Sequence, residues 1–198
     1  MKVILAYKNF ATQPGVSHIG LGVAGINNAK TLLAAGIACE VWAVQTAADL
    51  IKRLPTDPAV THVIVSAPWI AIADWTKILT QFPSIWFAVN CHSNVGFLQA
   101  DSNGVANMEG CLQLEKGYPN FRFSGNCRAF VRWIRDAYAA PCQYLPNLYY
   151  LNGMTRTNRP NFTVAPGTVL RIGCFGAVRP LKNAMSAGAA AIEIASRL

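Results

Sequence analysis

The sequence of 198 residues is long enough for one large domain or for one and a half domains of ordinary size. Hydrophobic residues make up 53% of the chain and charged residues only 13%, which excludes a disordered or fibrous protein and indicates a globular protein with a full apolar core. The net charge of +8 lies entirely in residues 118–198, where ten Lys and Arg outnumber two acids. We therefore expect this half to meet an anionic partner: a nucleotide diphosphate, a phospholipid surface or nucleic acid.

The N-terminus and the cysteines bear on the cellular compartment. Residues 1–5 lead directly into an apolar segment, with neither the charged n-region nor the cleavage site of a secretory signal. The longest uncharged runs contain prolines and several Asn residues, so we do not expect them to span a membrane. Several cysteines lie in apolar runs and no C-x-x-C pair occurs, which favours reduced core thiols over a disulfide framework or a zinc site. We expect a cytoplasmic protein, and peripheral membrane contact is left open.

Short apolar strands alternate with amphipathic helices over the first 150 residues. Strands are expected at residues 3–7, 39–44, 61–66, 84–90, 121–124 and 143–145. Helices are expected between them, at about residues 23–35, 47–54, 73–81, 105–116 and 127–138. This alternation predicts a Rossmann-like α/β domain over residues 1–150, with helices covering a parallel sheet.

Residues that favour helix ends support these boundaries. Gly36 is expected to close the first helix as its C′ residue. Thr46 and Asp49 form the pattern of a capping box at the start of the second helix. Asn126 is expected to cap the helix of residues 127–138, whose apolar face would begin at Cys127.

The polar face of that last helix carries three arginines, Arg128, Arg132 and Arg135, at positions i, i+4 and i+7. A stripe of this kind can bind nucleic acid or a membrane surface. Aromatic interleaving and lysine-rich runs are lacking, so a solvated helix surface is the favoured interpretation.

A second folding unit is expected after a linker rich in Asn, Thr, Arg, Pro and Gly at residues 151–167. Residues 169–175 predict a strand and residues 183–197 a helix, so that residues 168–198 form the first βα unit of a second, truncated Rossmann-like domain. Arg179 and Lys182 lie at the turn between them, where α/β folds bind phosphates and where two cations suit a diphosphate. An interpretation of equal weight is that Arg179 and Lys182 are two surface cations beside an ordinary turn, with no role in phosphate binding.

Polar loops follow two of the predicted strands at the edge where open α/β sheets bind ligands. His18 lies in the glycine-bearing loop after the first strand, and His92 lies in the loop after the fourth, beside Asn90. Gly20-x-Gly22-x-x-Gly25 matches a dinucleotide fingerprint literally. It lies about a dozen residues after the first strand and lacks the acidic partner at the end of the second, so NAD or FAD binding is disfavoured.

These motifs together resemble the GT-B glycosyltransferases, in particular the retaining family 4 group. The resemblance rests on Pro14-Gly15-Val16, Asn90-Cys-His-Ser93, Tyr144-Leu-Pro-Asn147 and the segment 171–183 with its Arg and Lys. It implies two Rossmann-like domains facing each other across a cleft, with the acceptor on the first and the nucleotide sugar on the second. It also implies that Arg179 and Lys182 hold the donor diphosphate without a metal or cofactor, and that His92 acts catalytically near the transferred sugar. Gly15, His18 and Asn147 would lie near the donor and the acceptor.

The resemblance sets the functional expectation and its alternatives. The donor would be a nucleotide sugar and the acceptor a glycan, a lipid-linked sugar or a small molecule, with no nucleic-acid partner. The paired glutamates of the family, E-x7-E, do not occur in this sequence, so we expect an incomplete chain that transfers no sugar alone and associates through residues 168–198. The alternatives are a non-catalytic α/β domain that binds a phosphate-bearing anion and, less favoured, a nucleotide-dependent oxidoreductase.

Overall fold

The structure is a computed structural model that describes residues 1–9, 19–93, 95, 98, 103–151 and 184–197. The chain divides into two compact units, Met1–Tyr150 and Leu151–Leu198, and each is treated by itself.

The first unit has the predicted order of strands and helices. Its strands are β1 (Lys2–Lys8), β2 (Ala38–Val44), β3 (Val60–Ser66), β4 (Trp86–Cys91), β5 (Phe121–Gly125) and β6 (Gln143–Tyr144). Its helices are α1 (Ile19–Ala34), α2 (Ala47–Arg53), α3 (Ile72–Gln81), α5 (Gly104–Gly117) and α6 (Arg128–Tyr138), with a short 3-10 turn at Leu54–Thr56.

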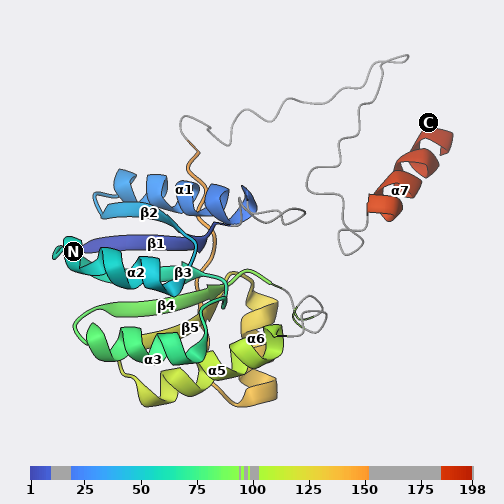
Figure 1. Cartoon of the computed structure of the whole chain (residues 1–198). Coiled ribbons are helices and arrows are strands. Elements are labelled where there is room, and N and C mark those ends of the chain that lie inside the picture. Colours follow the sequence, from blue (N-terminus) through green and yellow to red (C-terminus); the bar gives the residue numbers. More distant parts are fainter. Residues whose placement is uncertain (10–18, 94, 96–97, 99–102, 152–183, 198) are drawn as a thin grey trace. The chain divides into compact units, whose positions relative to one another are not determined.

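The six strands form one sheet in the order β2-β1-β3-β4-β5-β6, and every neighbouring pair is parallel. Figure 1 shows the strands lying side by side with helices packed around them. The prediction of a Rossmann-like α/β fold with a parallel sheet is therefore confirmed. Because all strands run the same way, their carboxyl ends meet along one edge of the sheet.

The two faces of the sheet are covered unequally. On one face the in-register side chains of Ile4, Val63, Phe87 and Phe121 join a large buried core. Buried residues of α2, α3, α5 and α6 belong to this core. On the other face α1 packs through Ala29 over a small cluster of β1 and β2 residues.

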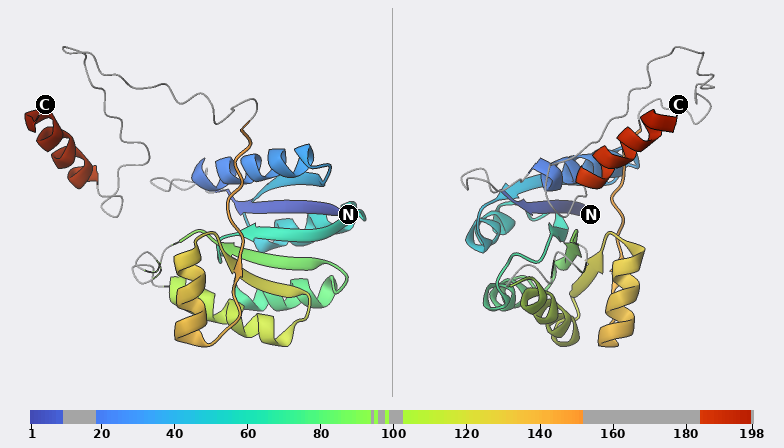
Figure 2. Two further views of the ribbon diagram at one scale, coloured as in Figure 1. Left: turned by 180° about the vertical axis from the view of Figure 1, so that it is seen from behind. Right: turned by 90° about the vertical axis from the view of Figure 1, so that its right-hand side faces the viewer.

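A segment that we call the strap, residues 145–150, crosses the second face of the sheet beside α1. It runs from β6 towards α1 as the orange trace in the left view of Figure 2. The backbone N–H of Leu145 donates to the carbonyl of Gly125 over 3.0 Å, and the N–H of Leu148 donates to Oδ1 of Asn28 in α1. The strap thus joins the last strand to the first helix.

The helix ends follow the sequence signals at two of three places. Thr46 and Asp49 form the expected capping box, and Gly36 has the left-handed φ of 76° that favours glycine at a helix end. The prediction of Asn126 as the cap of α6 is wrong. The N-cap is Cys127, which is exposed and makes no side-chain capping bond. Asn126 does not cap the helix because its side chain contacts His92 and its backbone N–H binds Cys91 at the sheet edge.

In the second unit the structure describes helix α7 (Ala184–Arg197), which confirms the helix predicted at residues 183–197. The predicted linker and the predicted strand at residues 169–175 lie outside the described residues. Within the described part of the chain, no helix is long and apolar enough to cross a membrane.

Two left-handed residues at helix ends give a matched stability test. Gly36 has open space where a Cβ would be, so Gly36→Ala should lower the free energy of unfolding by about 1 kcal/mol through backbone strain alone. Ala139 ends α6 at φ 47°, so Ala139→Gly should raise the same quantity by about 0.5 kcal/mol. Urea unfolding of both variants measures these changes. Equal stability of wild type and Gly36→Ala would show that this backbone is not strained.

Candidate functional site

A row of buried polar side chains lies at the carboxyl edge of the three central strands. Ser66 of β3 pairs in register with Asn90 of β4, and Asn90 pairs with Ser124 of β5. Their relative exposures are 8%, 2% and 1%. Side chains in register on parallel strands point to the same face, so these three form one polar row across the sheet, on the face that the strap crosses.

Asn90 is the centre of this row. Its Nδ2 donates to the carbonyl of Leu145 in the strap over 3.1 Å, and its Oδ1 lies 3.5 Å from Oγ of Ser124. The hydroxyl of Ser124 donates to the carbonyl of Val89 over 2.9 Å. Buried polar groups cost free energy unless they are hydrogen-bonded, so these bonds fix the positions of β4, β5 and the strap at the edge.

His92 follows β4 and is held by Asn126, which follows β5. Nδ2 of Asn126 lies 3.3 Å from Nδ1 of His92, and the backbone N–H of Asn126 donates to the carbonyl of Cys91 over 3.2 Å. With the amide nitrogen as donor, Nδ1 accepts, and the neutral ring carries its proton on Nε2. Burial lowers the pKa of His92, which favours this neutral form. Its Nε2–H can donate to an oxygen of a ligand.

The turn after β3 adds a strained backbone to the same edge. Ala67 has φ 70°, a value that L-residues other than glycine rarely adopt, and its N–H donates to the carbonyl of Asn90 over 2.8 Å. Nε1 of Trp69 is buried and has no hydrogen-bond partner among the residues that the structure describes. Nζ of Lys8, at the end of β1, lies 5.7 Å from the centre of the Trp69 ring. Strained backbone of this kind concentrates at functional sites.

Asn147 lies in the strap, two residues beyond the carbonyl that Asn90 binds. Its Oδ1 is buried and, within the described part of the chain, accepts no hydrogen bond. A buried acceptor of this kind can take a hydrogen bond from a water molecule or from a ligand.

The structure brings together only some of the residues that the sequence singled out. His92 follows the central strand β4, and Asn147 lies in the strap that Asn90 of the same strand anchors. Gly15, His18, Arg179 and Lys182 lie outside the described residues, so their predicted roles stay predictions.

The three glycines of the literal dinucleotide pattern lie inside α1. A Cβ added at Gly22 would come within 3.2 Å of the Tyr7 ring, and one added at Gly25 within 3.4 Å of Val41. These two glycines thus allow α1 to pack closely against β1 and β2, which is a structural reason for the pattern.

Sequence reasoning did not identify the residues that hold or flank His92. The sequence predicts Asn126 as a helix cap, and Ala67 and Trp69 belong to no motif. Turn residues at the ends of neighbouring parallel strands that are distant in sequence can be brought together only when the strand order is known, although the polar sequence after each strand is a usable signal.

The buried cysteines near the site, Cys91 and Cys111, are not reactive thiols. Burial raises the pKa of Cys91 to about 11 and that of Cys111 to about 12, which keeps both protonated at neutral pH. Among the described residues, no group of three or more His, Cys, Asp and Glu side chains is placed to hold a metal ion.

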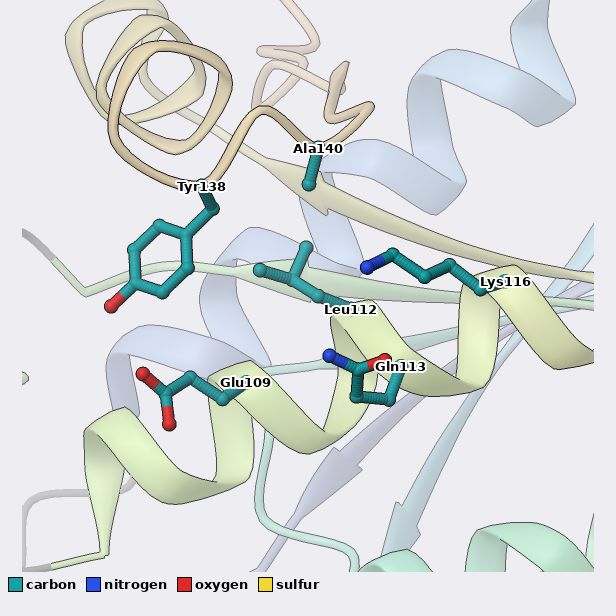
Figure 3. Close-up of a pocket in the computed structure, with 6 residues that line it drawn as sticks. All are labelled: Glu109, Leu112, Gln113, Lys116, Tyr138 and Ala140. Carbon is teal, nitrogen blue, oxygen red and sulfur yellow. The ribbon is translucent and has the colours of Figure 1, made fainter.

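A hollow of about 180 Å³ lies apart from this edge, between α5 and the end of α6 (Figure 3). Glu109 and Tyr138 face each other across it, with Lys116 further along α5. Burial, followed by the charge of Glu109, raises the pKa of Tyr138. Both helices run away from the carboxyl edge, so Tyr138 and Lys116, at their far ends, lie towards the opposite edge from His92.

Comparison with known proteins adds no family to this description: no protein-family model, no curated protein and no solved structure matches the chain.

The lowered pKa of His92 predicts a pH-dependent stability. Between the lowered pKa of the folded state and the ordinary value of about 6.5, the unfolded chain binds a proton that the folded chain does not. The contribution of His92 to the free energy of unfolding is therefore fully present above about pH 6.5 and is lost as the pH falls through the folded-state pKa. Urea unfolding of wild type and His92→Gln between about pH 7.5 and pH 5 measures it. The free energy of unfolding should depend less steeply on pH in the variant than in the wild type. An identical dependence in both would show that the imidazole is solvated in the folded protein.

Proposed function

We propose that the first unit is the acceptor-binding half of a nucleotide-sugar-dependent glycosyltransferase of the GT-B type. The observation that carries the proposal is the neutral His92, held by Asn126 beside the buried polar row at the carboxyl edge of a parallel sheet. Ligands of open α/β sheets bind at this edge.

The chemistry of the edge suits a polyhydroxylated ligand. Sugar hydroxyls both donate and accept hydrogen bonds, and the edge supplies groups of both kinds. Nε2–H of His92 and Nε1–H of Trp69 are donors, and Oδ1 of Asn147 is an acceptor. The indole of Trp69 also presents apolar surface beside polar groups, as carbohydrate binding requires.

The role proposed for His92 is to donate a hydrogen bond to an oxygen of the sugar near the reacting centre. A neutral imidazole with a fixed tautomer can do this without the cost of burying a charge. Asn126 acts through His92 by setting the ring orientation. The Arg179 and Lys182 pair of the GT-B resemblance would serve the donor diphosphate. Because the paired glutamates of that family are lacking, we expect the 198-residue chain to bind sugars without transferring them.

Binding of a sugar panel to the full chain tests the proposal. Mono- and oligosaccharides and nucleotide sugars would be screened by saturation-transfer NMR, and the affinities of the ligands found would be compared between wild type and His92→Gln. Loss of one hydrogen bond should weaken binding about threefold to tenfold. Lys77→Gln, an exposed change on α3 in a surface ion pair, is the control and should leave the affinity unchanged.

Two results would count against the proposal. Binding of a sugar with equal affinity by wild type and His92→Gln would remove His92 from the site. A response to NAD(P) in the absence of any response to sugars would favour the oxidoreductase instead.

A further inference from the structure

The three arginines of α6 line one groove together with Tyr144 of the edge strand β6. The groove has a volume of about 340 Å³, and Val131 and Asp136 complete its lining. Its charged groups are three guanidinium groups and one carboxylate, so the groove is strongly positive. The volume is within the range of small-molecule sites.

Two of the arginines are held in place by neighbouring groups. The guanidinium of Arg128 lies over the Tyr144 ring at 4.5 Å from the centroid, within the range of a cation–π contact. The guanidinium of Arg135 donates to the carbonyl of Cys142 over 2.8 Å. Side chains fixed in this way lose less conformational entropy when they bind an anion.

The charges of these arginines are not neutralised within the protein. Ion pairs in the described part of the chain involve other cations, so that no carboxylate, including that of Asp136, pairs with Arg128, Arg132 or Arg135. Arg128 is also the first residue of α6, whose first turn carries no acid and whose N-cap Cys127 makes no side-chain bond. A cation at that end of a helix is unfavourable, and an anion bound there would relieve the repulsion.

The groove begins at the same sheet edge as the candidate site. Tyr144 pairs in register with Gly125, the residue before Asn126, and Arg128 follows Asn126 by two positions. A small molecule in the groove would therefore bind close to the candidate site but to different residues, since the groove residues follow Asn126 in the sequence and His92 precedes it.

We infer that this arginine groove is a binding site for the phosphate group of a soluble small molecule, a phosphate ester or a diphosphate. Guanidinium groups bind phosphate oxygens in pairs, and two of these arginines are already oriented. The inference does not depend on sugar transfer.

A membrane surface is the main alternative partner, and the structure disfavours it. Helices that lie on membranes bury their apolar side in the bilayer. The apolar side of α6, with Phe130, Val131 and Ile134, is instead buried in the core of the protein.

The test uses inorganic pyrophosphate and two matched double variants of the full chain. Arg128→Glu with Arg132→Glu reverses two groove charges, and Lys30→Glu with Lys52→Glu makes the same change in net charge at exposed positions on α1 and α2. Calorimetry should show at least about tenfold weaker binding by the arginine variant and little change for the lysine variant. Amide NMR shifts should change at Ala129 and Tyr144 on titration of the wild type.

Folding and specificity are checked in the same samples. Glutamate in the first turn of α6 favours the helix, so the arginine variant should unfold at the temperature of the wild type or above it. The inference is overturned if pyrophosphate fails to bind the wild type at millimolar concentration, or if both double variants lose affinity equally. It is also overturned if the wild type binds phosphatidylglycerol-containing vesicles, but not phosphatidylcholine vesicles or pyrophosphate, because the partner is then a lipid surface.

Discussion

The side-chain amide of Asn90 is the interaction on which the arrangement of the sheet edge depends. It is almost fully buried in the central strand β4, and its Nδ2 binds the strap at Leu145. Without that bond a buried amide would lack its donor contact, and the segment that crosses the sheet would lose its attachment to the centre. His92 lies two residues further along the chain, so the bond that anchors the strap also fixes the start of the loop that presents the imidazole.

The need for such a strap follows from the topology. Parallel strands are joined by right-handed crossovers, and the direction of each step along the sheet decides which face its helix covers. The step from β1 to β2 runs one way and places α1 on one face, whereas the later steps run the other way and place their helices on the opposite face. Among the helices of the first unit that the structure describes, none covers β3, β4 and β5 on the side of α1. The strap covers part of that face. The change of direction falls between β1 and β3, and Lys8 and Trp69 lie at or just after the carboxyl ends of these two strands.

The sequence predicted the fold well and the site only in part, for one physical reason. Strands, helices and most helix ends depend on local patterns, such as the apolar run of β4 or the Thr46 capping box. Such a pattern lies within a few consecutive residues and can be recognised from the sequence alone. The site depends on register between strands that are distant in sequence. The position of His92 at the sheet edge could be predicted because it directly follows an apolar strand. Asn126 could not be assigned to it, since the pairing of β4 with β5 is what places the two loops together.

The groove on α6 shows the same limit, since its stripe of arginines is visible in the sequence. Tyr144 lines the groove together with these arginines, and it belongs to a two-residue edge strand whose position depends on pairing with β5.

Three buried side-chain polar atoms lack a hydrogen-bond partner among the described residues. Their locations suggest different reasons for the missing bond, namely tight packing in one case and a possible ligand in the other two. Nε1 of Trp75 belongs to an indole that lies between two aromatic rings in the core, with edge contacts to Phe87 at 5.8 Å and Phe121 at 5.1 Å. There the indole gains dispersion and quadrupole contacts that offset a missing bond. Among the described residues, no pair of aromatic rings encloses Trp69 or Asn147. Trp69 follows β3, and Asn147 lies in the strap that Asn90 anchors. A donor and an acceptor that are both unpaired near the carboxyl edge are complementary to a ligand that carries hydroxyl groups. The proposed ligand site therefore rests on polar groups near the edge rather than in the apolar core.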